Sequence, residues 1–265
     1  MDRNKVYETM SVTFDDGGIA EIVLNAPPVN CVSPELLRDL EQVTGELKEE
    51  KDLRAVVLTS ANPKIFSAGA DMKQFLSWDS AKGEEMSTWG YRIYLEFSRI
   101  QVPIVCAVEG GAYGGGLELA LSTDIRVFAE NAKVGVPECT LGVLPGYGGV
   151  PHIFELAGKG FASRMLYTGE AVSAEEALRA GICEYIAPKG ETLAKAREVA
   201  QKIASNGPIA IRAIKECLIK RSGGDVGDEP EFAENVWFGR LCDTKDRLEG
   251  VNAFLGKRKA EFKNE

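Results

Sequence analysis

The sequence contains a single histidine, His152, among its 265 residues. One histidine cannot build a His-rich metal site. A Ser-His-Asp triad around it would lack the Gly-x-Ser-x-Gly elbow that usually carries the serine, because no such motif is present. We therefore expect His152 to be structural or peripheral, and we expect no metal.

Cys-x-x-Cys pairs are also absent. The six cysteines are scattered along the chain: Cys31, Cys106, Cys139, Cys183, Cys217 and Cys242. Four of the six have apolar neighbours, which is typical of reduced core thiols. This usage favours a reducing compartment and predicts a cytoplasmic location.

No apolar run reaches the length of a membrane span, and the first residues carry no apolar segment typical of a secretory signal. The formal net charge is −9, which argues against nucleic-acid binding as the main task. We therefore predict neither a membrane nor a nucleic-acid partner.

Strand and helix patterns alternate in the first part of the chain. A hairpin is predicted over residues 6–24, a helix after Ser33 and Pro34, and an apolar strand over 54–60. This order is typical of an α/β fold with a parallel sheet. After Gly149 the patterns are mostly helical, with a link predicted at 222–228. We expect a core over residues 1–200 and a helical region over 201–265.

The chain is organised around a glycine-rich stretch, Gly114 to Gly116, that follows an apolar strand. Glycines allow a ligand to approach the backbone, and N–H groups at the start of a helix suit a phosphate or an oxyanion. No Gly-Lys-Ser/Thr follows, and the spacing departs from the dinucleotide fingerprint. An acid, Glu118, stands where a phosphate would be repelled, so acid–base chemistry beside an oxyanion hole fits better.

Two acids in apolar settings are candidates for that chemistry. Glu118 lies within Leu117 to Leu121, and Glu138 follows Pro137 among valines and leucines. Most glutamates are solvated surface charges, and that alternative stands for each acid taken alone. A carboxylate inside an all-apolar helix needs a partner or a function. Apolar surroundings are the usual means by which a protein raises the pKa of a pair of carboxyls.

These motifs closely resemble the enoyl-CoA hydratase/isomerase (crotonase) family. The resemblance rests on residues 114–118 (GGGLE), 137–138 (PE), 141–149 (LGVLPGYGG) and 66–71 (FSAGAD), in this order and nearly end to end. It implies a crotonase-like spiral of repeated ββα units, a helical C-terminal region that trimerises, often as dimers of trimers, and a role in fatty acid metabolism.

The resemblance implies hydration of a 2-enoyl-CoA, with the N–H groups of Ala68 and Gly115 as the oxyanion hole. Glu118 would deprotonate the water and Glu138 would protonate C2. CoA arrives as part of the acyl-CoA thioester substrate, so no separate cofactor is implied. Retention of both glutamates favours hydration over isomerisation, for which one carboxylate commonly serves. The alternatives are an isomerase, another hydroxyacyl-CoA dehydratase, and a non-catalytic acyl-CoA-binding or scaffold protein.

The resemblance also implies contacts with CoA. Ala70 and Asp71 would lie along the adenine and ribose. Residues 28–30 (PVN) replace a lysine that some family members have after the first strand, so a phosphate contact would be either missing there or supplied by Lys64. Phe254 and Lys257 would reach the CoA of a neighbouring subunit, although a solvated basic helix end explains them equally well.

The aromatic segment 75–95 fits an acyl pocket in its first half and a core helix in its second. Core packing is favoured for Ile93 to Ile100, and a pocket role for part of Phe75 to Trp89. Tyr113 is expected to narrow the acyl channel.

Overall fold

The computed structural model describes residues 4–222 and 230–265. Its main sheet has seven strands in the order β1-β2-β3-β5-β8-β10-β13, antiparallel from β1 to β3 and parallel from β3 onward. These strands are β1 (Asn4–Val6), β2 (Met10–Phe14), β3 (Ile19–Leu24), β5 (Ala55–Ser60), β8 (Ile104–Val108), β10 (Ile125–Ala129) and β13 (Tyr185–Ala187).

Short strands form a second layer beside the main sheet. Four of them pair in the order β12-β11-β9-β6, and two more pair as β4-β7. Their bounds are β4 (Cys31–Val32), β6 (Ile65–Ser67), β7 (Gly69–Ala70), β9 (Gly111–Tyr113), β11 (Lys133–Gly135) and β12 (Val172–Ser173). The chain therefore repeats one pattern: a main-sheet strand, a short strand of the second layer, then a helix. This is the predicted spiral of ββα units.

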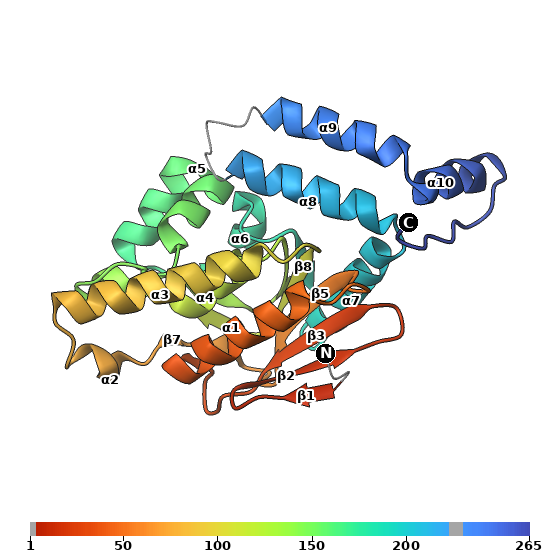
Figure 1. Cartoon of the computed structure of the whole chain (residues 1–265). Helices are drawn as coiled ribbons and strands as arrows, with labels where there is room; N and C mark the ends of the chain where they lie inside the picture. Colours follow the sequence, from red (N-terminus) through yellow and green to blue (C-terminus); the bar gives the residue numbers. More distant parts are fainter. Residues whose placement is uncertain (1–3, 223–229) are drawn as a thin grey trace.

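Helices surround the sheets (Figure 1). They are α1 (Pro34–Lys48), α2 (Met72–Phe75), α3 (Ser80–Ser98), α4 (Gly115–Leu121), the 3-10 helix η1 (Pro137–Leu141), α5 (Gly149–Thr168), α6 (Ala174–Ala180), α7 (Thr192–Ala204), α8 (Pro208–Ser222), α9 (Pro230–Cys242) and α10 (Lys245–Leu255). No helix in the described ranges is long and apolar enough to cross a membrane.

The two faces of the main sheet are buried against different helices. On β5, Val56 and Leu58 belong to the cluster that contains the apolar face of α1, whereas Ala55 and Val57 belong to the cluster that contains α7. Successive side chains of a strand point to opposite faces, so an all-apolar strand is what a sheet covered on both sides requires.

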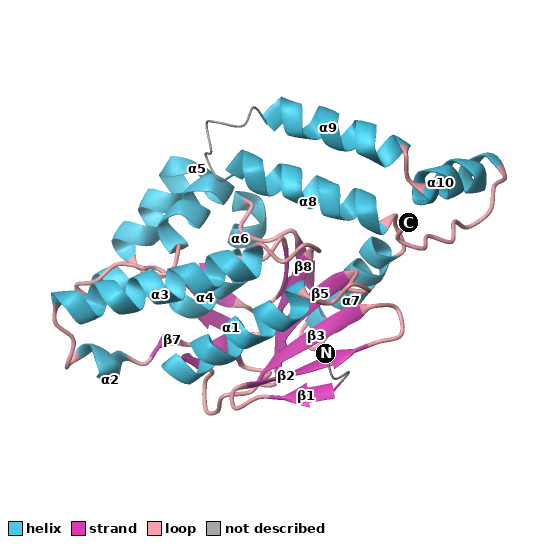
Figure 2. Cartoon of the chain, in the orientation of Figure 1, coloured by secondary structure: helices cyan, strands magenta, loops and turns pink. Residues whose placement is uncertain are grey.

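The helical end of the chain differs from the predicted division. The predicted boundary at residue 200 falls inside α7, whose Ala196 and Ala200 are fully buried against the sheet. Helix α7 therefore belongs to the core, while α8 and α9 lie side by side above the strands (Figure 2). The link predicted at 222–228 lies, except for Ser222, outside the described residues.

None of the six cysteines, all within the described ranges, forms a disulfide. Cys106 and Cys183 are buried, Cys31 and Cys217 are half-buried, and Cys139 and Cys242 are exposed. Two cysteines, not four, are thus fully buried core thiols.

Candidate active site

A cavity of about 790 Å³ lies where the loop after β6, the start of α4, η1 and the α2–α3 segment meet. Its wall includes five of the residues predicted from the sequence: Ala68, Ala70, Gly115, Glu118 and Glu138. Residues separated by up to 70 positions are thereby brought to one site by the repeated ββα pattern.

Glu118 is held at the base of this cavity by backbone groups. It lies on α4 and is 1% exposed. Its Oε1 accepts hydrogen bonds from the N–H of Tyr147 at 2.8 Å and the N–H of Gly149 at 2.7 Å. Burial raises the pKa of Glu118 to about 7, and the two hydrogen bonds oppose that rise only in part. A carboxyl with this pKa can take up or release a proton near neutral pH.

Glu138 faces the same cavity from η1. Its Oε2 is buried and has no hydrogen-bond partner in the described structure. Burial raises the pKa of this carboxyl, and its charge also raises that of Glu118. An unpartnered buried carboxyl oxygen in a cavity wall is available to a ligand or to water.

Gly114 makes room for Glu138. Its φ is +50°, and a Cβ built at this position would overlap the carboxyl group of Glu138. Its N–H donates to the carbonyl of Gly135 at 2.9 Å, which ties the start of α4 to β11. Glycine is therefore required at position 114 for two reasons: the backbone has a positive φ, and the Glu138 carboxyl lies against the Cα.

The loop after β6 approaches the start of α4 just as closely. A Cβ at Gly69, whose φ is +84°, would lie 2.7 Å from the carbonyl oxygen of Tyr113 and 3.3 Å from the backbone nitrogen of Gly115. The N–H of Gly115 belongs to the first turn of α4 and has no acceptor within the helix. Its carbonyl also accepts a hydrogen bond from the buried hydroxyl of Tyr94 at 2.9 Å.

The N–H of Ala68 is already used within the protein. It donates to the carbonyl of Val29 at 3.0 Å, and the neighbouring N–H of Gly69 donates to Oγ of Ser67 at 3.2 Å. The prediction that Ala68 supplies an oxyanion-hole donor therefore conflicts with the geometry, because a ligand would have to displace Val29.

The apolar wall of the cavity comes partly from the predicted aromatic segment. Phe75 and Trp78 line the cavity with ring centroids 4.4 Å apart. Ile93, Phe97 and Ile100 are buried in the core, as expected. Tyr113 is absent from the cavity wall, and its ring lies over Gly111, so the predicted narrowing of the channel by Tyr113 is wrong.

The other predicted CoA contacts lie outside this cavity. Lys64 borders a separate hollow beside Asn25 and Pro27, and the Asp71 carboxylate accepts the N–H of Lys73 at the start of α2. Phe254 is 82% exposed near the end of α10, just before Lys257. Helix α10 lies at the opposite end of the molecule from α2 (Figure 1). Within one chain, these two residues do not reach the cavity.

Some residues that shape the site carry no signal in the sequence. Tyr94 is spaced like any core residue of α3, and Tyr147 and Gly149 act through backbone N–H groups.

His152 does not line the cavity; burial lowers its pKa, and its Nδ1 has no partner in the described part of the chain. Within the described ranges no three His, Cys, Asp or Glu side chains are grouped so as to hold a metal.

Two carboxyls and a glycine-rich backbone turn line one cavity of an α/β fold, an arrangement that suits an enzyme active site. Comparison with known proteins gives the family. Residues 15–265 match the family described as enoyl-CoA hydratase/isomerase, and the chain belongs to that family.

Individual relatives agree. The short-chain-enoyl-CoA hydratase of Clostridium acetobutylicum is 34% identical over 94% of this chain and 96% of its own length. The 2,3-dehydroadipyl-CoA hydratase of Escherichia coli is 34% identical over 91% and 94%. The crystal structure of an enoyl-CoA hydratase from Bacillus anthracis superposes with a TM-score of 0.90 at 35% identity, covering 97% of this chain and all of that one. These matches confirm the predicted family, the crotonase fold and an enzyme of the enoyl-CoA hydratase class.

Proposed function

We propose that this enzyme catalyses the reversible hydration of a 2-enoyl-CoA to a 3-hydroxyacyl-CoA, with Glu118 and Glu138 as its acid–base pair. The observation that supports this most directly is that both carboxyls, each with a raised pKa, line one apolar cavity together with the start of α4. Hydration needs one group to remove a proton from water and one to protonate carbon. Two carboxyls around one cavity meet that need.

The addition requires an electrophilic double bond. Hydrogen bonds from backbone N–H groups to the thioester oxygen draw electron density from C3 and stabilise the enolate that forms when water adds there. Glu118 takes one proton of the water as its oxygen bonds to C3. Glu138 delivers a proton to C2 as the enolate collapses to the thioester. The reverse sequence eliminates water.

The N–H of Gly115 is the first donor in this proposal. The second comes from the loop after β6, which passes next to Gly115. Since Ala68 and Gly69 both spend their N–H groups inside the protein, Ala70 is the better candidate. This replaces the expectation that Ala70 lies along the CoA adenine.

Assembly into a homo-oligomer, a trimer or a dimer of trimers, is part of the proposal. An apolar groove of about 520 Å³ runs between η1 and α5, and its wall includes exposed side chains such as Leu144, Phe154 and Tyr167. Exposed apolar patches of this kind mark interaction sites. Sedimentation velocity on the purified chain would show a trimer or hexamer, whereas a monomer at micromolar concentration would contradict this part.

The test of the reaction is loss of the conjugated enoyl thioester absorbance of crotonyl-CoA. Glu118→Gln and Glu138→Gln keep the size of each side chain and remove its proton chemistry, so each should lower kcat by about 100-fold or more. Glu175→Gln, on the exposed face of α6, is the matched control and should retain wild-type activity. An isomerase that relies on Glu138 would keep most of its activity in Glu118→Gln. A folded wild-type enzyme that hydrates neither crotonyl-CoA nor hexenoyl-CoA would refute the proposal.

A further inference from the structure

The charged side chains of the cavity wall are all acidic. Besides Glu118 and Glu138, the wall contains Asp79 and Glu84, and no Lys, Arg or His belongs to it among the residues that the structure describes. The rest of the wall consists of apolar side chains, glycines, Tyr147 and Ser87.

Asp79 is the N-cap of α3 and Glu84 lies within that helix, and both line the cavity. Ser87 of α3 donates a hydrogen bond to the carbonyl of Gly146 at 2.8 Å, and the next residue, Tyr147, holds Glu118 through its N–H. Glu84 lies one turn before Ser87 on the same helix face. In the proposed binding mode, with C1 at Gly115 and with C2 and C3 between the glutamates, the acyl chain would extend toward this part of α3.

Two cations of α3 are paired with other acids. Lys82 pairs with Glu85 at 3.1 Å, and Arg92 pairs with Glu41 at 2.9 Å. Both cations border an outer groove on the other side of Trp78. Trp78 lines both hollows, so its ring separates the acyl cavity from the cationic surface outside.

A carboxylate at the end of an acyl chain would meet unfavourable surroundings here. The rings of Phe75 and Trp78 would strip part of its water, no cation of the wall would pair with it, and two like charges would face it. A terminal methyl group would instead gain from the apolar wall, and a cationic end would be attracted by the acids and the aromatic rings.

We infer that the α2–α3 segment makes this enzyme select against acyl chains that end in a carboxylate, through Asp79 and Glu84. Its substrates are enoyl-CoA thioesters whose acyl group ends in a neutral or cationic group. The inference rests on the proposed hydratase function and narrows its substrate class by a repulsive element, a common source of specificity. Both acids are exposed, so solvent screens their charges and the discrimination is moderate.

The test uses two substrates of equal chain length that differ only at the far end. Hex-2-enoyl-CoA ends in a methyl group, and 2,3-dehydroadipyl-CoA ends in a carboxylate. The readout is the ratio of kcat/KM for the dicarboxylic substrate to that for the methyl-ended one. We expect a ratio of about 0.1 or less for the wild type at low salt, rising with ionic strength as the charges are screened.

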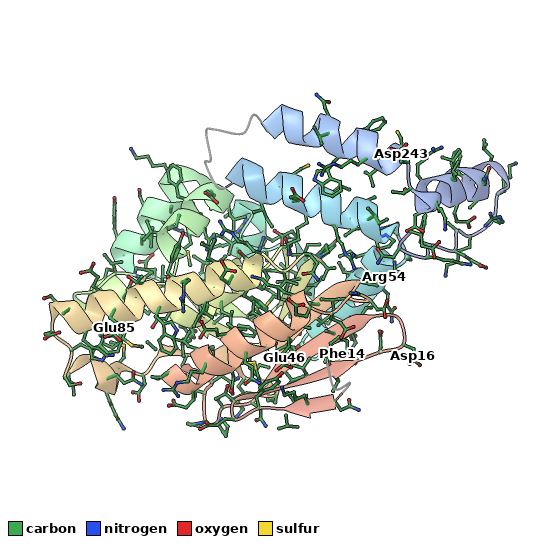
Figure 3. The ribbon with its side chains drawn as sticks, in the orientation of Figure 1. Phe14, Asp16, Glu46, Arg54, Glu85 and Asp243 are labelled. Atoms are coloured by element: carbon green, nitrogen blue, oxygen red, sulfur yellow. The ribbon has the colours of Figure 1, made fainter. Side chains whose placement is uncertain are left out.

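The double variant Asp79→Asn, Glu84→Gln should raise this ratio about fivefold or more, because it removes both charges from the wall. Asn keeps the helix cap that the Asp79 side chain forms with the N–H of Lys82. Glu85→Gln is the matched control: Glu85 is the next residue of α3 (labelled in Figure 3), is exposed and does not line the cavity. Its ion pair with Lys82 borders the outer groove behind Trp78, so release of Lys82 on that side should leave the ratio at the wild-type value.

Binding of the saturated analogues hexanoyl-CoA and adipoyl-CoA, measured by calorimetry, gives a second readout that needs no turnover. The inference predicts that hexanoyl-CoA binds more tightly than adipoyl-CoA. This preference should become smaller in the double variant and stay unchanged in Glu85→Gln. Such a result supports the inference even if the reaction proves not to be hydration. A wild-type ratio near one, equal binding of the two analogues, or equal changes in the double variant and in Glu85→Gln would each overturn it. Loss of turnover with hex-2-enoyl-CoA but preserved discrimination in binding would instead count against the proposed reaction alone.

Discussion

The N–H of Gly149, the first residue of α5, donates to Oε1 of Glu118 at 2.7 Å. This contact joins the start of α5 to the carboxyl on α4. It favours the ionised carboxylate, yet the pKa of Glu118 still stands at about 7 because burial opposes the charge more strongly. Glu118 is thus oriented by the backbone while remaining able to exchange a proton.

The raised pKa of Glu118 predicts a stability that falls with pH. The folded protein holds this proton up to about pH 7, whereas the unfolded chain releases it near its ordinary value of 4.5. Native stability therefore decreases as pH rises from 4.5 to 7, and at pH 8 the buried charge costs about 3 kcal/mol. Glu118→Gln removes this cost, so its stability relative to wild type should increase by that amount between pH 4.5 and pH 8.

Urea unfolding of both proteins at several pH values measures this difference. Glu175→Gln is the control, since its side chain is exposed, and its curve should run parallel to that of the wild type. A constant difference between Glu118→Gln and wild type across the range would show that Glu118 titrates normally.

Gly114→Ala should damage activity more than it damages stability. The added Cβ would overlap the carboxyl group of Glu138 and would sit at a φ of +50°. The backbone conformation, with φ +50° and ψ −128°, costs about 1–3 kcal/mol, but displacement of Glu138 would remove the proposed proton donor to C2. We expect kcat to fall about 100-fold or more. A matched control is Gly190→Ala, where φ is +88° and a Cβ would meet nothing within 4 Å.

Hydration assays and thermal melts of both variants separate the two effects. Equal shifts in melting temperature, with activity lost only in Gly114→Ala, would assign the loss to Glu138. Similar activity in the two variants would mean that Glu138 tolerates the displacement.

Local patterns in the sequence predict much of this arrangement. The triple glycine and the two acids in apolar settings indicate the site, and the spacing of Leu36, Leu40 and Leu47 predicts the buried face of α1, which the structure confirms. These signals depend on neighbours within a few residues of each other, where helix and turn geometry determine the outcome.

Contacts between distant segments are what the sequence does not reveal. Ala68 looks like an available donor in the loop after β6, but the carbonyl of Val29, 39 positions earlier, occupies its N–H. Tyr113 looks like an acyl-channel residue, yet its ring lies over Gly111. Residue 200 resembles a boundary because helices follow it, whereas the burial of α7 depends on strands far earlier in the chain. In each case tertiary packing decides between options that are locally equivalent.

Tyr94→Phe tests how firmly Gly115 must be held. The buried hydroxyl of Tyr94 donates to the carbonyl of Gly115 at 2.9 Å, and its ring packs edge-on against Tyr147, with centroids 5.5 Å apart. Removing the hydroxyl leaves the helical hydrogen bond of that carbonyl intact but deletes one partner, which costs about 1 kcal/mol of unfolding free energy. The first turn of α4 then gains freedom at the N–H of Gly115, the proposed donor to the thioester oxygen. We expect kcat to fall about 3- to 10-fold with KM nearly unchanged, less than the 100-fold or more lost with a complete oxyanion donor.

Tyr91→Phe, at a half-exposed position on the same helix, should leave both constants at wild-type values. A Tyr94→Phe enzyme that is destabilised but fully active would show that the hydroxyl serves the core alone, because a donor that fixes the oxyanion hole must affect the rate and not only the stability.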